Sequence, residues 1–280
     1  MLKVLLNKIS KDEIFVVELS SYQLDDMEFS PDIAVITNLF PEHMDYHKGV
    51  ENYYVAKKNI INFQNSWNYF IYNRDDEKLR KWAKDSKAIN IPFGGKKISE
   101  KMDTKLLGGH NQKNIEAALA VAHVLKISDK ITKRAIKNFQ PLSHRLELVG
   151  KFKGIKFYDD AISTTPQSTI AALEAIPNVK TIFLGGEDRG YDFLQLEKEL
   201  GKYKIENIVL FPESGKRILK SKKNFRILET KSMKKAVEFA YKYTPKGSAC
   251  LLSTASPSYS LWKNFEEKGD EFKKAIRKIE

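Results

Sequence analysis

The chain has 280 residues, of which 42% are hydrophobic, and it carries a formal net charge of +12. At roughly 150 residues per domain this length predicts two domains with apolar cores, and no run approaches the ~20 apolar residues of a membrane-spanning helix, so we expect neither a disordered chain nor membrane insertion. The single cysteine, Cys250, excludes an internal disulfide framework and indicates a cytoplasmic protein, while lysines spread along the whole chain argue against nucleic-acid binding.

The first half predicts buried strands and helices of an α/β domain. Residues 15–19 (F-V-V-E-L) and 33–36 (I-A-V-I) are apolar, β-branched runs typical of buried parallel strands, and residues 67–72 form a third. Residues 111–125 predict a helix whose alanines give it a slim packing face. Pro141 follows the next helical pattern, so we place a domain boundary between residues 141 and 142.

The second half alternates between short apolar runs and helical patterns. The expected strands are residues 155–158, 181–184, 207–211, 225–228 and 248–252. The expected helices are residues 169–175, 193–201, 231–243 and 261–279. This alternation predicts βαβ units and a mostly parallel sheet that is covered by helices on both faces.

Two polar side chains of the first half follow predicted strands. Glu18 closes the first strand and His43 comes shortly after the second, so both are expected at the carboxyl edge of the sheet, where Mg²⁺ or Mn²⁺ could bind. His43 and His47 have the spacing of a helical zinc site, but Met44 stands where H-E-x-x-H needs its glutamate, so we set a zinc hydrolase aside. From spacing alone, Lys57 is a solvated helix lysine.

Further polar groups start helices or follow strands of the second half. Asn111 and Asn114 can cap a helix or hydrogen-bond an adenine edge, and Arg145 suits a phosphate. Asp160 ends a strand and leads into a hydroxyl-rich turn at a helix start. Residues 185–190, G-G-E-D-R-G, lack the G-x-G-x-x-G spacing, which argues against NAD. Together these turns predict a binding edge.

Several strings in this order resemble the Mur ligase family. They are residues 18–24 (E-L-S-S-Y-Q-L), 42–45 (E-H-M-D), 110–114 (H-N-Q-K-N), 144–145 (H-R) and 263–272 (K-N-F-E-E-K-G-D-E-F). The last string is the most specific, and the resemblance runs through almost the whole chain. It implies an α/β fold with a partial central ATP-binding domain over residues 1–141, followed by a Rossmann-like, D-glutamate-binding C-terminal domain over residues 142–280.

The resemblance also implies roles for individual residues. It makes catalytic residues and magnesium ligands of Glu18, His43 and Lys57, the last once carbamylated, which overturns the solvated reading of Lys57. It implies nucleotide contacts by Asn111, Asn114, Arg145 and Asp160. It implies substrate contacts by Ser20, Thr164, Arg189, Ser258 and Phe265.

Within the family, the strings resemble the branch that adds D-glutamate to UDP-N-acetylmuramoyl-L-alanine in peptidoglycan precursor synthesis. This resemblance implies ATP as co-substrate, Mg²⁺, an acyl-phosphate intermediate and a monomer. Two positions depart from some members of the branch, because Ile162 and Arg189 stand where those members have lysines. Arg189 keeps the charge and adds a planar fork for a carboxylate.

A phosphate loop of the form G-x-x-x-x-G-K-[ST] does not occur in the chain. In the family, that loop and a UDP-binding domain precede the segment around Glu18. We therefore expect a chain that lacks both and that has little or no ligase activity alone. Two alternatives stay open: a non-catalytic fragment of the same enzyme, and a sister amide ligase such as folylpolyglutamate synthase.

Overall fold

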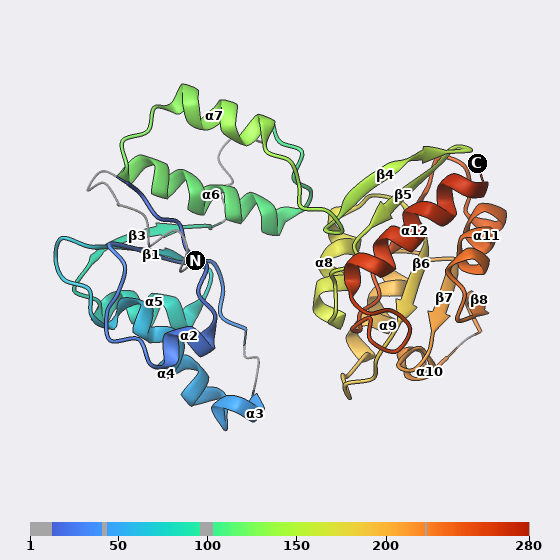
Figure 1. Ribbon diagram of the computed structural model, residues 1–280, viewed down its shortest axis with the longest axis horizontal. Coiled ribbons are helices and arrows are strands. Elements are labelled where there is room, and N and C mark those ends of the chain that lie inside the picture. The colour runs from blue at the N-terminus through green and yellow to red at the C-terminus, as the bar shows by residue number, and fades with distance from the viewer. Residues whose placement is uncertain (1–12, 41–43, 96–102, 222, 280) are drawn as a thin grey trace. The chain divides into compact units, whose positions relative to one another are not determined.

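A computed structural model describes residues 13–40, 44–95, 103–221 and 223–279 (Figure 1). The chain forms two compact units, one within Met1–Ile98 and Glu116–Lys126, the other within Ser99–Ile115 and Ile127–Glu280. Helix α6 (Gly109–Val124) contributes its first residues to the second unit and its later residues to the first. The domain boundary between residues 141 and 142 stays a prediction. None of the described helices has the length and apolar character needed to span a bilayer.

The first unit contains a three-stranded parallel sheet. Its strands lie in the order β1 (Ile33–Ile36), β2 (Tyr69–Asn73) and β3 (Ile89–Phe93). Its helices are α2 (Ser21–Asp25), α3 (Met44–His47), α4 (Val50–Asn62) and α5 (Glu77–Asp85), together with the later part of α6.

Alternate residues of these strands face opposite sides of the sheet. Ala34 and Phe70 pack in one apolar cluster with Leu79 of α5, whereas Ile71 packs in another with Ala117 of α6. This is the two-residue period of a strand, here covered on both faces. The buried Ala117 confirms the predicted slim packing face of α6.

The strand predicted over residues 15–19 is wrong. These residues lie outside every strand, and 94% of Val16 is exposed. Within the described sheet β1 pairs only with β2, so no described strand lies beside the 15–19 run. An apolar, β-branched run favours a strand only where a sheet accepts it. Glu18 is therefore an exposed residue of an irregular segment and does not close a strand.

The second unit contains a six-stranded sheet in the order β4-β5-β9-β6-β7-β8. The strands are β4 (Glu147–Phe152), β5 (Ile155–Asp159), β6 (Val179–Gly185), β7 (Asn207–Phe211), β8 (Arg226–Glu229) and β9 (Ala249–Leu252). The helices are α7 (Asp129–Asn138), α8 (Pro166–Ala175), α9 (Leu194–Lys202), α10 (Gly215–Ile218), α11 (Met233–Tyr243) and α12 (Phe265–Ile279). All neighbouring strands are parallel except β4 and β5, which confirms the predicted α/β fold and its five strands.

Two strands were missed from the sequence because each lies at a sheet edge. In β3, Pro92 cannot donate a ladder hydrogen bond and therefore argues against a strand, although an edge position tolerates it. β4 joins β5 through Lys153 and Gly154, whose φ angles of 47° and 85° give a two-residue hairpin turn of the primed type. That turn pair was the overlooked signal for β4.

Helices cover both faces of the six-stranded sheet. Leu173 of α8 and Leu196 of α9 share one buried cluster. Val237 of α11 and Phe272 of α12 share the other with Cys250 of β9, which is a core residue. Complete burial of a side chain such as Phe272 contributes about 1.5–3 kcal/mol. This two-sided core makes the sheet a rigid base for the turns at its carboxyl edge.

Candidate functional site

Polar turns follow three strands of the six-stranded sheet at their carboxyl ends. Asp159 ends β5 and Asp160 comes next, Gly185 ends β6, and residues 253–258 follow β9. These strands are parallel neighbours, so their turns meet at one edge, where open α/β sheets bind ligands. The turns after β6 and β9 also touch, because the Gly185 N–H donates to the Thr254 carbonyl at 2.8 Å.

Asp160 lies inside this edge and is only 2% exposed. Its Oδ2 accepts hydrogen bonds from the hydroxyls of Ser163 and Ser253, and its Oδ1 accepts one from the Leu146 N–H at 3.2 Å. Burial raises the pKa of Asp160 to about 6, although these hydrogen bonds favour the ionised form. The predicted ribose contact of Asp160 stays a prediction.

The raised pKa of Asp160 has a consequence for stability. Between the ordinary value of 3.8 and about 6, the folded chain keeps a proton that the unfolded chain has lost. This group therefore stabilises the fold below pH 3.8, and that stability is lost as the pH rises towards 6. We expect the free energy of unfolding of Asp160→Asn to rise by about 3 kcal/mol relative to that of the wild type as the pH goes from about 4 to about 7. Urea unfolding of both chains across this range measures the difference. A difference that does not change with pH would contradict this.

A buried lysine that the sequence interpretation did not single out lies near Asp159 and Asp160. Lys268 of α12 is 0% exposed, and its Nζ donates to Thr254 Oγ1 at 2.6 Å. Burial lowers the pKa of Lys268 to about 7, against the attraction of Asp159 and Asp160, which raises it. In the sequence it looks like any other helix lysine, and only its place within the 263–272 string marks it.

Three of the four predicted nucleotide residues line one pocket of about 190 Å³ in the second unit: Asn111, Asn114 and Arg145. The Asn111 amide donates to the Leu107 carbonyl at 2.7 Å, and the Asn114 amide donates to Asn111 Oδ1 at 3.3 Å. Burial and the charge of Arg145 lower the pKa of His110, so this imidazole is neutral at pH 7. The pocket therefore offers amides for a planar ring, and the cationic side chains of its wall, Arg145 and Lys105, supply charge for an anion.

The predicted D-glutamate residues lie on separate turns of the same carboxyl edge and at the start of α12. Thr164 is half-buried after β5, and Arg189 is exposed after β6, where its Nε donates to Glu187 at 3.0 Å. Phe265 begins α12 and is half-buried. The Ser258 hydroxyl after β9 is buried and has no hydrogen-bond partner among the described residues. Because an unpartnered buried hydroxyl costs about 1–3 kcal/mol, it is expected where a ligand or water supplies the partner.

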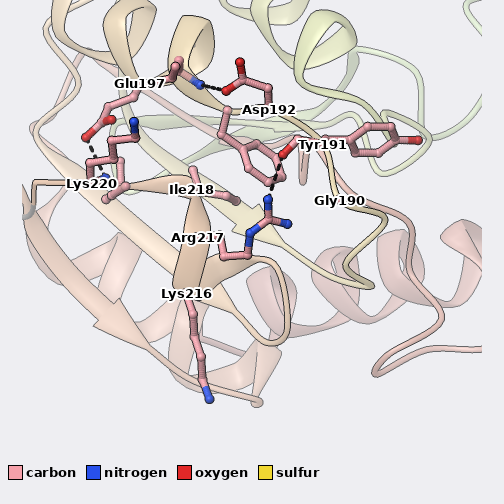
Figure 2. A pocket seen from close by; sticks show the side chains of 11 residues that line it. Gly190, Tyr191, Asp192, Glu197, Lys216, Arg217, Ile218 and Lys220 are labelled. Atoms are coloured by element: carbon pink, nitrogen blue, oxygen red, sulfur yellow. Dashed lines mark hydrogen bonds between the residues drawn. The ribbon is translucent and has the colours of Figure 1, made fainter.

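A second pocket, of about 490 Å³, begins at Gly190 and continues along α9 and α10 (Figure 2). Figure 2 shows the Arg217 guanidinium reaching the Tyr191 carbonyl, to which it donates at 3.3 Å. Glu197 accepts a hydrogen bond from the Lys220 N–H at 2.9 Å. The chain itself satisfies these polar groups of the wall, so we assign no ligand to this pocket.

The predicted magnesium residues belong to the first unit. Glu18 is exposed and Lys57 is half-buried on α4, whereas His43 lies outside the described residues. Glu18 is not part of any group of three possible metal-ligating His, Cys, Asp or Glu side chains in the described ranges. Ser20, the predicted substrate contact, caps α2, where its Oγ accepts from the Gln23 N–H at 3.3 Å. The magnesium site therefore stays a prediction.

His47, which has zinc-like spacing from His43, is a core residue. It is buried, and its Nε2 lies 2.9 Å from Ser21 Oγ. The ring also packs edge-on against Tyr46 and Tyr53, with centroids 4.8 and 5.5 Å away. These contacts join α2, α3 and α4.

One group of His, Asp and Glu side chains among the described residues has the spacing of a metal site. The ligand atoms of His144, Glu147 and Asp159 all lie within 4.8 Å of one another. The Lys273 ammonium lies 2.7 Å from Glu147 Oε2 and 3.5 Å from Asp159 Oδ2. A cation of the chain itself thus neutralises these carboxylates, so the group does not call for a metal.

Comparisons with known proteins agree with the resemblance. The sequence pattern of the Mur ligase middle domain matches residues 1–101. The chain is 36% identical over 282 residues to a UDP-N-acetylmuramoylalanine–D-glutamate ligase of Streptococcus agalactiae serotype III, covering 93% of the chain and 62% of that relative. It is 36% identical over 293 residues to the ligase of that name from Ligilactobacillus salivarius, covering 96% and 64%. The chain thus spans less than two thirds of these relatives.

Solved structures share the fold at lower identity. The MurF ligase of Thermotoga maritima in complex with ADP is 20% identical, with a TM-score of 0.68, over 90% of this chain and 64% of that one. The UDP-N-acetylmuramate–alanine ligase MurC of the same organism is 18% identical, with a TM-score of 0.64, over 90% and 61%. At these identities the likeness shows the arrangement of the elements alone.

Proposed function

Because the chain belongs to the Mur ligase family, we propose that it carries the nucleotide-binding and D-glutamate-binding parts of an ATP-dependent ligase that joins D-glutamate to UDP-N-acetylmuramoyl-L-alanine. The relatives named for that reaction support this, at 36% identity over 93% of the chain. The observation that carries the proposal is the pocket lined by Asn111, Asn114 and Arg145. Since the chain spans 62% of that relative, the activity of the whole protein is part of the proposal.

In the proposed complex, the adenine ring of ATP lies against Asn111 and Asn114, whose amides both donate and accept hydrogen bonds. Arg145 binds the phosphates, because a guanidinium forms strong, charge-assisted bonds to phosphate oxygens. Asp160 accepts a hydrogen bond from a ribose hydroxyl. The small volume of the pocket, about 190 Å³, suits part of a nucleotide better than a whole one.

The proposed reaction has two steps. A carboxylate oxygen of UDP-N-acetylmuramoyl-L-alanine attacks the γ-phosphorus of ATP, so ADP departs and an acyl phosphate forms. The D-glutamate amine then attacks the acyl carbon, loses a proton, and inorganic phosphate departs with its C–O bond electrons. Arg145 stabilises charge on the transferring phosphoryl group. Thr164, Arg189 and Ser258 orient D-glutamate towards the acyl carbon, with Phe265 packing beside it.

Several finer points belong to the same proposal. Mg²⁺ held by Glu18, His43 and carbamylated Lys57 would neutralise phosphate oxyanions when bound. Ser20 adds a substrate contact beside this site. We place the protein in the cytoplasm, as a monomer, in peptidoglycan precursor synthesis.

Calorimetric titration of the 280-residue chain with ADP and Mg²⁺, with and without bicarbonate, tests the nucleotide pocket. Since the sequence contains no phosphate loop, we expect weak but saturable binding. Asn111→Ala and Arg145→Gln should each weaken it about tenfold, the value of one lost charged or buried hydrogen bond. Arg134→Gln, an exposed arginine on α7, is the matched control and should leave the affinity unchanged.

No binding at any reachable concentration, or an affinity that is indifferent to both pocket variants, would overturn the nucleotide assignment. A phosphate-release assay with ATP and both substrates separates ligase from fragment. We expect little or no turnover by the chain alone. Turnover like that of an intact ligase would show that the phosphate loop is dispensable, against our expectation.

A further inference from the structure

Arg145 lies between two residues whose backbones adopt an unfavourable conformation. The φ angle is 63° at His144 and 49° at Leu146, in the left-handed region that side chains with a Cβ rarely occupy. Such residues persist only where the surrounding structure holds them. The direction of the Arg145 side chain therefore depends on what fixes its two neighbours.

Two consecutive carboxylates fix these neighbours. The Asp159 Oδ2 lies 2.8 Å from His144 Nδ1, and since a carboxylate only accepts, the imidazole donates. The Asp160 Oδ1 accepts from the Leu146 N–H at 3.2 Å. Each flank of Arg145 is thus bonded to one residue at the carboxyl end of β5.

Lys273 of α12 supplies the countercharge for Asp159. Its Nζ lies 3.5 Å from Asp159 Oδ2 and donates to Glu147 Oε2 at 2.7 Å. The same Glu147 oxygen accepts a hydrogen bond from the His144 backbone N–H at 2.9 Å. The Asp159 side chain is 0% exposed and that of Lys273 is 14% exposed. A buried carboxylate without a cation would be strongly unfavourable, so the Lys273 ammonium stabilises this network.

Helix α12 approaches this network so closely that only glycine fits at position 269. A Cβ there would lie 2.1 Å from His144 Nδ1 and 2.6 Å from Asp159 Oδ2. The ring of Phe265, one turn earlier, meets the His144 ring edge-on at 6.0 Å between centroids. The 263–272 string therefore brings α12 against the turn that carries Arg145.

We propose that Asp159, through His144 and with Lys273 as its countercharge, is a positioning residue that aims Arg145 into the pocket with Asn111 and Asn114. It touches neither nucleotide nor substrate. The inference rests on the proposed function for what Arg145 binds, but not for how Arg145 is held. It also links α12, which bears Phe265 of the D-glutamate end, to the arginine of the nucleotide end.

Amide hydrogen exchange in the 280-residue chain tests directly whether Asp159 and Lys273 fix the backbone around Arg145. Asp159→Asn keeps the shape and removes the charge, and Lys273→Met removes the cation. We expect both to speed exchange at the Arg145 and Leu146 amides about tenfold or more, because a charge-assisted hydrogen bond is lost or weakened. Lys274→Met, the exposed neighbour on α12, should leave it unchanged. Exchange in β6 and β7 should not change in any of the three, which excludes general unfolding.

ADP affinity tests the consequence. Asp159→Asn should weaken ADP binding about as much as Arg145→Gln, and the double variant should be no weaker than Arg145→Gln, since Asp159 acts through Arg145. Unchanged exchange at Arg145 in Asp159→Asn and Lys273→Met, or additive losses in the double variant, would overturn the inference. If exchange at the Arg145 and Leu146 amides becomes faster but Arg145→Gln leaves the ADP affinity unchanged, the role of Asp159 in fixing Arg145 is supported. Only the proposed nucleotide function is then contradicted.

Discussion

Replacing Gly185 by alanine is expected to lower the free energy of unfolding of the second unit by about 3 kcal/mol or more. Gly185 ends β6 with φ at 101°, which an alanine adopts only with strain. A Cβ there would also lie 2.1 Å from the carbonyl oxygen of Phe211 in β7. The clashing atom belongs to the backbone of a central strand, so no side-chain rotation can relieve it.

Gly190→Ala is the matched control for this prediction. Gly190 also has a positive φ, 73°, but a Cβ there would meet nothing within 4 Å. We therefore expect only the conformational cost, about 1 kcal/mol. Urea unfolding of both variants measures the two costs, and equal losses would show that strain, not the collision with Phe211, makes glycine necessary at 185.

The glycine matters for function because it draws the turns of the candidate site together. The Gly185 N–H reaches the Thr254 carbonyl, and Glu187, two residues later, donates its N–H to the Pro257 carbonyl at 2.9 Å. The β6 turn with Arg189 and the β9 turn with Ser258 are thereby joined through their backbones. A side chain at 185 would separate them even if the sheet survived.

The six-stranded sheet was predictable because its central strands are buried on both faces and so appear as continuous apolar runs. The same rule failed at residues 15–19, where an equally apolar run has no strand beside it in the described part of the chain and is largely exposed. Local sequence measures the preference of a segment for a strand, whereas the presence of a neighbouring strand is a property of the fold. The edge strand β4 failed in the opposite sense, since Gly150 and exposed positions hide its preference.

The candidate site likewise has features that local sequence predicts and features that depend on the fold. Asn111, Asn114 and Arg145 were predicted from strings of the sequence, and the structure gathers them around one pocket. The charged side chains beside Arg145 were not predicted. Lys273 lies 114 positions beyond Asp159 in the chain, and nothing in a helix lysine reveals which buried carboxylate it will meet. Long-range ion pairs of this kind follow from packing, not from local pattern.

The second prediction concerns Lys268, whose fully buried ammonium should make stability depend on pH above neutrality. Burial lowers its pKa from 10.5 to about 7, although Asp159 and Asp160 attract the charge. Between these values the unfolded chain binds a proton that the folded chain has released. The stability contributed by this group is therefore fully present above 10.5 and is lost as the pH falls through about 7. Between about pH 7 and 10.5, each pH unit changes the free energy of unfolding by up to about 1.4 kcal/mol.

Urea unfolding at about pH 7, 8 and 9 measures this effect as the difference between the wild type and Lys268→Met, in which a thioether of similar length replaces the ammonium. The free energy of unfolding of the wild type should rise relative to this variant by about 1–1.4 kcal/mol per pH unit. Subtraction cancels groups that titrate in both chains, and Lys274→Met, an exposed lysine on the same helix, should follow the wild type. A constant difference would mean that Lys268 keeps its proton throughout, held by Asp159 and Asp160. The cluster at the end of β5 would then be a permanent ion pair, and its attraction would outweigh the cost of burial.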